Sequence, residues 1–387
     1  MENPFRYGEI VTGRAFTDRR TELAELTADI HNGQNVVIIS PRRYGKTSLV
    51  FQAIDGLKRE GVLVAYLDMF RTPSKDRLAT HLAQSIYGGL VAPFGRLWQR
   101  ATDVFRNLPL NPKITINQDG APSFEFAPGE RERDVDQAIE ALLGLPGQIA
   151  QERQRRVAFV IDEFQQAVDI DPHLPAVMRA VFQLQTEVAH VFLGSRQHLL
   201  QRVFTAENEP MYRLAKPLPL RAIPAADFAE FIASQFASSG QRITGEAVER
   251  ILTATGCHPH DTQELSYFTW EMARSEGAPA GASTVVRALE RVIDAEDARY
   301  TTLWEGLSPY RRLVLLSVAS AGGNGIYSQE YRRQHRLGAA SSVQRAMAYL
   351  LENDLVESTP DGAYHVPDAF LRAWLQRLSV SQPIKRP

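Results

Sequence analysis

The N-terminal half of the chain alternates short apolar runs with amphipathic stretches. The run from Val157 to Ile161, "VAFVI", is five consecutive apolar residues, which is typical of a central strand in a parallel sheet covered on both faces. The stretch from Ser48 to Lys58 instead carries Leu49, Ala53 and Leu57 at helical spacing. Four strands are predicted in this way: Val36–Ile39, Val62–Met69, Val157–Ile161 and Ala189–Leu193. Strands that alternate with helices predict an α/β domain with a parallel sheet.

Helical periodicity dominates the chain after about residue 217. Phe228, Phe231, Ile232 and Phe236 fall on one face of a helix that runs from Asp227 to Ala237. Further helices are predicted at Gly245–Ala254, at His260–Ser275, and in a stretch that ends near Tyr300. These segments predict a small helical domain over residues 217–300, following a domain over residues 1–216.

The pattern changes again over residues 301–387. Ser308 and Pro309 supply a capping residue and a first-turn proline for one helix, and "YSQEYRRQH" predicts a short second helix. Ser341–Leu351 predicts a third helix from its apolar spacing. "LVES" and "AYHV" then flank a turn at Pro360-Asp-Gly, which predicts a hairpin. Three helices followed by a hairpin are the pattern of a winged helix.

A long insertion separates the second and third predicted strands. Helical patterns run from Arg77 to Leu108, and Lys113–Asn117 and Ser123–Phe126 alternate around the turn Gln118-Asp-Gly-Ala. The sequence therefore predicts a hairpin within an insertion at about residues 109–133. It carries no catalytic pattern, so a partner-binding appendage and a passive insertion both remain open.

Composition narrows the class of protein. The 387 residues are 44% hydrophobic and 23% charged, with a net charge of -2, so overall charge does not favour nucleic acid. No apolar run approaches the roughly 18 residues of a membrane span, and "MENPFRYGEI" lacks the apolar core of a signal peptide. Cys257 is the single cysteine, which agrees with a reducing compartment. A cytoplasmic location without membrane contact is predicted.

The stretch from Ser40 to Thr47, "SPRRYGKT", nearly matches the phosphate-binding loop G-x-x-x-x-G-K-[ST]. It follows a predicted strand and opens a predicted helix, where loop amides and the helix N-terminus face phosphates. Lys46 is placed to reach the β and γ phosphates of ATP, and the Thr47 hydroxyl to ligate Mg²⁺. Ser40 replaces the first glycine, which reduces flexibility at a tight turn. The predicted nucleotide-binding residues here are Ser40, Pro41, Arg42, Arg43, Tyr44, Gly45, Lys46, Thr47 and Ser48.

Two other predicted strands end in residues suited to phosphoryl transfer. "VAFVI" runs into Asp162, which can hold Mg²⁺ through water, and Glu163, which can polarise the attacking water. The strand at Ala189–Leu193 is followed by Gly194, Ser195 and Arg196. Because ligands bind at the carboxyl ends of parallel strands, Arg196 is predicted to sense the γ-phosphate. Lys46, Glu163 and Arg196 are the predicted catalytic residues, with Thr47 and Asp162 as metal ligands.

In this order and spacing, the motifs resemble the P-loop ATPases of the AAA+/STAND group, and most closely the archaeal-type ATPase family that is also common in bacteria. The residues that carry the resemblance are "VTGRAFTDRRTELAEL", "SPRRYGKTSL", "VAFVIDEFQ", "FLGSRQHLL" and "TGCHPHDTQEL". The resemblance implies an ASCE-type α/β core with ATP and Mg²⁺, a helical lid and a C-terminal winged helix. It also implies that Gly13 and Arg14 lie against the nucleotide base and that Pro259 of the lid contacts the nucleotide.

Several alternatives stay open at this point. The cluster from Cys257 to Asp261 contains potential metal ligands, but zinc sites need a second ligand pair and none is evident, so a role in the lid is favoured. The winged helix carries 10 Lys or Arg and 7 Asp or Glu over residues 301–387, so either double-stranded DNA or a protein could be its partner. Arg202 and Arg213 could act on a neighbouring subunit of a homo-oligomer or be surface charges.

The sequence accordingly predicts a Mg²⁺-dependent ATPase that acts as a nucleotide-controlled switch. The alternatives are a non-catalytic, nucleotide-gated DNA-binding or adaptor protein and a small-molecule phosphotransferase. Glu163 argues against a pure binder, which does not need that carboxylate. No acceptor site for a phosphotransferase is identified.

Overall fold

The computed structural model describes residues 2–13, 16–17, 19–92, 113–116, 122–125, 132–359 and 361–381. The chain divides into two compact units. Thr12–Arg221 forms the sheet unit, and Met1–Val11 together with Ala222–Pro387 forms the helical unit. The chain therefore passes between the units twice. No helix among the described residues is long and apolar enough to cross a membrane.

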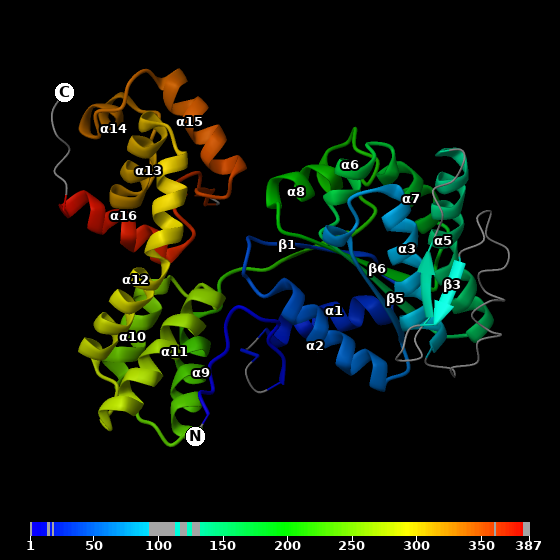
Figure 1. Cartoon of the computed structure of the whole chain (residues 1–387), viewed down its shortest axis with the longest axis horizontal. Helices are drawn as coiled ribbons and strands as arrows, with labels where there is room; N and C mark the ends of the chain where they lie inside the picture. The colour runs from blue at the N-terminus through cyan, green and yellow to red at the C-terminus, as the bar shows by residue number, and fades with distance from the viewer. Residues whose placement is uncertain are drawn as a thin grey trace. The chain divides into compact units, whose positions relative to one another are not determined.

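The sheet unit is built on five parallel strands in the order β2-β5-β6-β1-β7 (Figure 1). The strands are β1 Val36–Ile39, β2 Leu63–Asp68, β5 Val157–Asp162, β6 Val188–Gly194 and β7 Lys216–Pro219. The four predicted strands are confirmed, each within one residue of its predicted ends. The sequence does not predict β7, because Pro217 and Pro219 argue against a strand. They are tolerated because β7 lies at the sheet edge and pairs only with β1.

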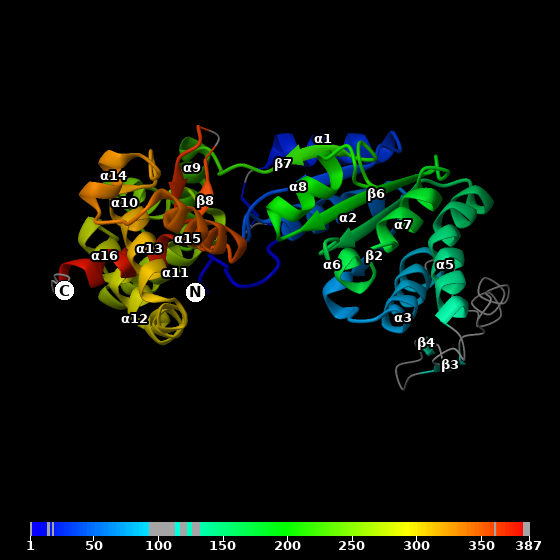
Figure 2. The same cartoon turned by 90° about the horizontal axis from the view of Figure 1, so that it is seen from above.

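Helices cover both faces of this sheet (Figure 2). Ala158 and Val160 pack with α1 and α2, whereas Phe159 and Ile161 pack with α3, α5 and α7 on the opposite face. Both faces are buried, which explains why β5 is apolar from Val157 to Ile161. The helices of this unit are α1 Arg20–His31, α2 Lys46–Arg59, η2 Met69–Arg71, α3 Lys75–Ile86, η3 Tyr87–Val91, α5 Glu132–Arg153, α6 Gln166–Ile170, α7 Leu174–Phe182 and α8 Gln197–Thr205.

The predicted insertion hairpin is confirmed in its strands. β3 (Lys113–Ile116) pairs antiparallel with β4 (Pro122–Glu125). Its predicted turn lies outside the described residues, as does the second half of the helical pattern predicted from Arg77 to Leu108. α3 begins two residues before its predicted start at Arg77 and passes into the π-helix η3.

The helical unit begins with four helices and the N-terminal segment. These helices are α9 Ala225–Ser238, α10 Gly245–Thr255, α11 Pro259–Glu276 and α12 Ala282–Gly306. The predicted helices are confirmed here, although α12 extends six residues beyond Tyr300. Phe5 of the N-terminal segment is fully buried against Phe231 and Phe236 of α9. The segment thus belongs to the core of this unit, which the sequence does not predict.

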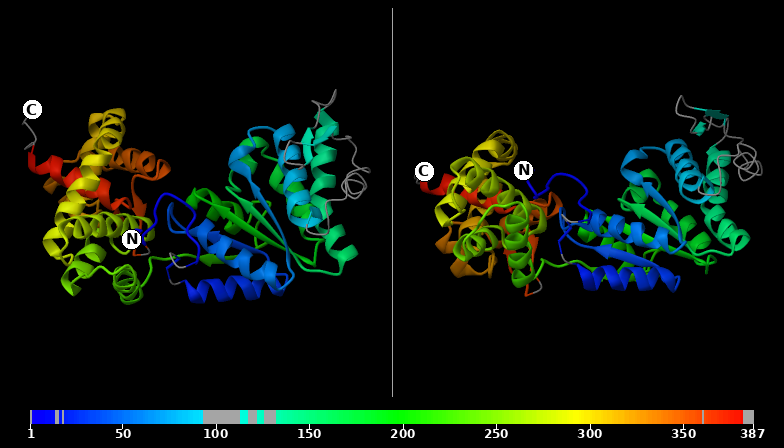
Figure 3. Two further views of the ribbon diagram at one scale, coloured as in Figure 1. Left: turned by 60° about the horizontal axis from the view of Figure 1, so that its bottom comes forward. Right: turned by 90° about the horizontal axis from the view of Figure 1, so that it is seen from below.

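The C-terminal elements complete the helical unit. They are α13 Pro309–Ala321, α14 Gln329–Gln334, α15 Ala340–Glu352, β8 Glu357–Ser358, β9 Tyr364–His365 and α16 Ala369–Ser381. Ser308 caps α13 by accepting from the backbone N–H of Arg311, with Pro309 in the first turn, as predicted. α16, which the sequence does not predict, packs against α12 and α13 (Figure 3). One hydrophobic core runs through α9 to α16, so these helices form a single body.

Candidate nucleotide site

The phosphate-binding loop lies between β1 and α2 in the sheet unit. Gly45 is the N-cap of α2 with φ 81°, and Arg43 has φ 63°. These are the left-handed positions of the loop, and Ser40 is not among the residues with positive φ. A Cβ on Gly45 would meet open space, so its backbone angle, rather than crowding, favours glycine. The serine in place of the first glycine therefore imposes no left-handed strain on the loop.

Lys46 is turned back onto its own loop. Its Nζ donates to the carbonyl oxygens of Ser40, at 3.1 Å, and Pro41, at 2.7 Å, and the residue is 7% exposed. Ser40 is also buried, whereas Arg42 and Arg43 are exposed and Pro41, Tyr44, Thr47 and Ser48 are half-buried. Two neutral carbonyls are weaker partners for an ammonium group than a phosphate. Lys46 can therefore exchange them for an anion that enters the loop.

Asp162 joins the loop to the end of β5. Its Oδ2 accepts a hydrogen bond from Thr47 Oγ1 at 3.3 Å and another from Tyr66 OH at 2.6 Å. Its Oδ1 accepts from the backbone N–H of Glu163 at 2.9 Å. Thr47 and Asp162, which are 115 residues apart in sequence, are thus brought together as the motifs predict. A hydroxyl beside a carboxylate supplies the hard oxygen donors that Mg²⁺ prefers.

The electrostatics of Asp162 differ from those of a surface carboxylate. Its pKa is raised, first because burial disfavours the charged form and further because Glu163 and Asp68 are negative. The hydrogen bonds from Tyr66 and the Glu163 backbone oppose this shift. Among the described residues no basic side chain is recorded in an ion pair with Asp162. A buried carboxylate in this state gains from a nearby cation.

Glu163 lies beside the end of β6. Its Oε2 accepts from Ser195 Oγ at 2.8 Å, from the Ser195 backbone N–H at 3.3 Å, and from Gln165 Nε2. Its backbone has φ 54°, a left-handed conformation that is uncommon for a residue with a side chain. The carboxylate is thus held on one oxygen, and Oε1 has no recorded hydrogen bond among the described residues.

Arg196, in contrast, is exposed. Its Nη1 lies 3.8 Å from Asp169 Oδ2, and both side chains are about half exposed. The residue at this strand end that contacts Glu163 is Ser195, to which the sequence analysis gives no role. Of the two other candidate arginines, Arg202 pairs with Glu209 at 3.1 Å.

The segment before α1 also reaches the loop. Gly13, with φ 64°, donates its backbone N–H to Gln52 Oε1 of α2 at 3.0 Å, and Arg14 lies outside the described residues. The arginine that contacts the loop is Arg19, which is 5% exposed and donates to the carbonyl oxygen of Tyr44 at 3.2 Å. Glu22 orients the Arg19 side chain, because its Oε1 lies 2.7 Å from Arg19 Nη1. Arg19 stands three residues before Glu22 of the motif, a spacing that could have singled it out.

Pro259 lies in the helical unit, in the first turn of α11. His258 caps this helix, and two residues after Pro259 comes Asp261, which is 1% exposed. Asp261 Oδ1 lies 3.2 Å from His258 Nδ1 and 3.3 Å from His260 Nδ1, and Oδ2 accepts the backbone N–H of Ala369 in α16 at 3.1 Å. Among the described residues no group of His, Cys, Asp and Glu has the arrangement of a metal site. This cluster instead joins α11 to α16.

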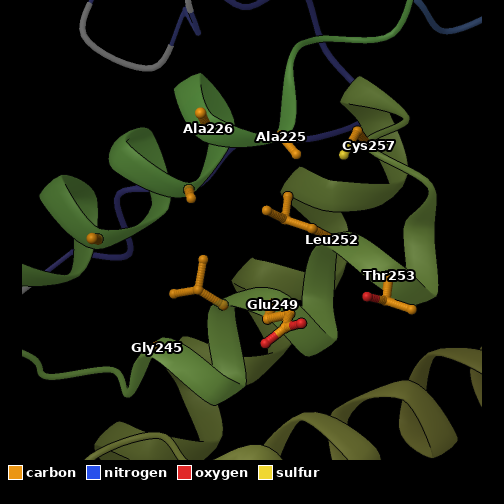
Figure 4. Close-up of a pocket in the computed structure, with 10 residues that line it drawn as sticks. Ala225, Ala226, Gly245, Glu249, Leu252, Thr253 and Cys257 are labelled. Atoms are coloured by element: carbon orange, nitrogen blue, oxygen red, sulfur yellow. The ribbon is translucent and has the colours of Figure 1, made fainter.

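The helical unit also contains a pocket of about 580 Å³ between α9 and α10 (Figure 4). Its lining is mainly alanine, valine and leucine, with Glu249 and Thr253 at α10 and Cys257 at one end. No converging set of donors or acidic groups accompanies it among the lining residues. The chemistry suited to a phosphate therefore lies in the sheet unit.

Comparison with known families agrees with this geometry. Residues 16–265 match a family described as an ATPase domain predominantly from Archaea, and residues 298–377 match a probable winged helix domain. The predicted P-loop core and winged helix are thereby confirmed. No protein with a curated description matches the chain.

Solved structures share the fold at low identity. A Walker-type ATPase of Pyrococcus abyssi is 14% identical with a TM-score of 0.64, covering 94% of this chain and 96% of that one. The Orc2 protein of Aeropyrum pernix, in ADPNP and ADP complexes, is 16% identical with a TM-score of 0.54 and 98% coverage of both chains. The Orc1 protein of the same organism, in complex with DNA, is 14% identical with a TM-score of 0.50 and 96% coverage of both chains.

Proposed function

The chain belongs to the family of ATPase domains found predominantly in Archaea, and on this basis we propose that it binds and hydrolyses ATP with Mg²⁺ as a nucleotide-controlled switch. The observation that carries the proposal is the meeting of Thr47 and Asp162 at 3.3 Å, next to Lys46 and Glu163. These groups come from the loop and from the end of β5, and they combine phosphate, metal and water chemistry at one sheet edge. The predicted cytoplasmic location is part of this proposal.

The loop holds the phosphates. Backbone N–H groups between Ser40 and Ser48 face the anion at the start of α2, and Lys46 leaves its carbonyl partners for the β and γ phosphates. Thr47 and Asp162 would hold the metal. Mg²⁺, when bound, neutralises charge on the phosphate oxygens during transfer.

Glu163 orients and polarises the attacking water through Oε1, while Ser195 and Gln165 hold Oε2. Arg196 leaves Asp169 to contact the γ-phosphate; its half-exposed ion pair is weak enough to exchange. Gly13 lies near the base, and Arg19 holds the loop through the Tyr44 carbonyl oxygen.

The switch operates through the helical unit. Pro259 contacts bound nucleotide, so the helical unit closes on ATP and reopens after hydrolysis. Pro259 and Asp261 share the first turn of α11, and Asp261 accepts from the N-terminus of α16. Arg372 of α16 also donates to the Ala254 carbonyl oxygen at 3.1 Å. These two hydrogen bonds provide a direct route by which a displacement of the α11 N-terminus can reach α16.

Hydrolysis of ATP with Mg²⁺ by the parent, Lys46→Ala and Glu163→Gln tests the catalytic assignment. Both variants should turn over at least about 100-fold more slowly, and Glu163→Gln should keep nucleotide binding. Lys58→Ala is the matched control, since Lys58 is an exposed lysine at the far end of α2. Turnover of Glu163→Gln equal to that of the parent would instead favour the non-catalytic nucleotide-gated protein.

We propose double-stranded DNA, rather than a docking protein, as the partner of the winged helix. Arg333, Arg336 and Arg345 are exposed on α14, the following turn and α15, and no ion pair is recorded for them among the described residues. Arginines on such a surface can contact phosphates or base edges. The Orc1 relative was solved with DNA, which agrees with this choice.

Measuring Lys46-dependent turnover with and without duplex DNA tests that choice. Duplex DNA should raise turnover, and the triple change Arg333→Ala, Arg336→Ala and Arg345→Ala should abolish the increase. Arg287→Ala, at an exposed ion pair with Glu276, is the control. Turnover indifferent to DNA would move the winged helix to protein docking or to homo-oligomer formation.

A further inference from the structure

Tyr66 occupies a position of the sheet that reaches Asp162 diagonally. On β2 it pairs in register with Val160, and Asp68 pairs with Asp162. Side chains two residues apart on a strand share a face, so Tyr66, Val160 and Asp162 lie on the same side of the sheet. This is the face that α2 covers. A long side chain at Tyr66 can therefore cross from β2 to the carboxylate at the end of β5.

The Tyr66 side chain is fixed at both ends. Its ring lies 5.1 Å from that of Phe51, centroid to centroid, and Phe51 is one helical turn after Thr47 on α2. Its hydroxyl donates to Asp162 Oδ2 at 2.6 Å. Burial, followed by the negative charge of Asp162, raises the pKa of Tyr66, so the phenol stays protonated and can donate to the carboxylate.

The hydrogen bonds of Asp162 can be counted against its capacity. An ionised carboxylate offers about four acceptor positions on its two oxygens. Tyr66 OH and Thr47 Oγ1 fill Oδ2, and the Glu163 backbone N–H takes one position on Oδ1. One acceptor position on Oδ1 is left over by these three donors. The bond from Tyr66 is the shortest of the three and that from Thr47 the longest.

We propose that Tyr66 is a positioning residue for the metal site, which orients the Asp162 carboxylate so that its remaining acceptor position serves a metal-bound water. The assignment rests on the proposed function, because it concerns the same site. Without the phenol hydroxyl, Oδ2 keeps only the 3.3 Å bond from Thr47, and the carboxylate is oriented mainly by the Glu163 N–H on Oδ1. The ring packing against Phe51 does not need the hydroxyl, so phenylalanine isolates its role.

Binding of a fluorescent ADP analogue, titrated with Mg²⁺ and repeated in EDTA, tests the proposal on Tyr66→Phe. The Mg²⁺ concentration for half-maximal effect should rise about tenfold, in line with a hydrogen bond to a charged group. The affinity measured in EDTA should stay within about twofold of the parent, because the loop binds phosphate without Tyr66.

Tyr300→Phe is the matched control. Tyr300 OH also donates to a carboxylate, Asp368 Oδ1, at 3.1 Å, but it lies in the helical unit. It should match the parent in Mg²⁺ dependence while losing comparable thermal stability to Tyr66→Phe. A purely structural role for Tyr66 would lower affinity in EDTA as much as in Mg²⁺, and that result overturns the proposal.

An unchanged Mg²⁺ requirement in Tyr66→Phe also overturns the assignment and leaves the proposed function intact. A parent protein that binds the analogue equally with and without Mg²⁺ contradicts the proposed function itself. The two failures are therefore distinguished by the parent titration alone.

Discussion

Asp162 of the sheet unit and Asp261 of the helical unit are both buried, with exposures of 8% and 1%, yet their surroundings differ. Among the described residues the donors to Asp162 are neutral, and burial, together with the negative Glu163 and Asp68, raises its pKa. Burial would also raise the pKa of Asp261, but hydrogen bonds with His258 and His260 and a backbone N–H outweigh it and hold the pKa well below its usual value.

The difference separates a buried carboxylate that has neutral hydrogen-bond donors from one that has histidine partners. A buried charge is stabilised where partners surround it, and it costs stability where they are missing. A carboxylate surrounded by partners can tie two elements together, as Asp261 does for α11 and α16. A buried carboxylate with few partners is typical of functional sites, where local stability is lower and binding is favoured. Exchanging each carboxylate for its amide should therefore have opposite consequences.

The largest effect is expected for Asp162→Asn on catalysis. If Asp162 holds the metal as proposed, removing its charge should lower Mg²⁺-dependent turnover by about 100-fold or more. Thermal stability without nucleotide should stay the same or rise, because an undercompensated buried charge is removed. Steady-state hydrolysis and thermal unfolding of the same preparation check both parts. A large loss of stability would show that Asp162 is a structural carboxylate like Asp261.

Asp261→Asn should show the reverse pattern. The helical unit should lose about 2–4 kcal/mol of unfolding free energy, because the histidines and the Ala369 N–H lose a charged partner. Basal turnover measured below the unfolding transition should remain within about twofold of the parent. Denaturant unfolding measures the first part, with Asp294→Asn as control, since Asp294 is an exposed partner of Arg377. Equal stability losses for the two variants would contradict the comparison.

A pH series sharpens the contrast at Asp261. Because its folded pKa is depressed, its contribution to stability is present above its ordinary pKa of 3.8 and is lost as pH falls toward the folded value. The stability difference between the parent and Asp261→Asn should therefore shrink below about pH 4. His258, His260 and Glu264 are the charged or titratable neighbours of this cluster. A difference that grew on acidification would have the wrong sign for a depressed pKa.

These two aspartates also mark how far the sequence could be read. Asp162 follows a run of buried apolar residues that predicts a strand. Strands, loops and helices have local sequence patterns, so β1, β5 and the loop can be predicted to within about a residue. Besides the nearby His258 and His260, Asp261 is bound by the backbone N–H of Ala369, 108 residues away. Because every residue except proline has a backbone N–H, the residue type does not show which N–H will bind Asp261. The role of Asp261 is therefore visible only in the structure.

The neutral donors that orient Asp162 and Glu163 are also difficult to predict from sequence. Tyr66 sits in a strand as an aromatic residue, where packing explains it without a hydrogen bond. Ser195 stands next to Arg196, whose charge made it the more obvious candidate. Ser195 could have been identified from its place directly after β6, the strand beside β5, whose end is followed by Glu163. Sequence patterns thus identify charged groups more readily than the neutral donors that orient them.

The smallest effect is expected for His260→Gln. His260 Nδ1 lies 3.3 Å from Asp261 Oδ1 and 3.7 Å from Glu264 Oε2, and its side chain is 17% exposed. Glutamine keeps a donor for the carboxylate, and His258 and the Ala369 N–H remain, so the helical unit should lose no more than about 1 kcal/mol. Denaturant unfolding of His260→Gln and Asp261→Asn side by side measures the fraction of the Asp261 stabilisation that His260 contributes. A loss as large as that of Asp261→Asn would mean that His260 provides nearly all the stabilisation of the Asp261 carboxylate. Asp261 would then differ from Asp162 mainly by this one histidine.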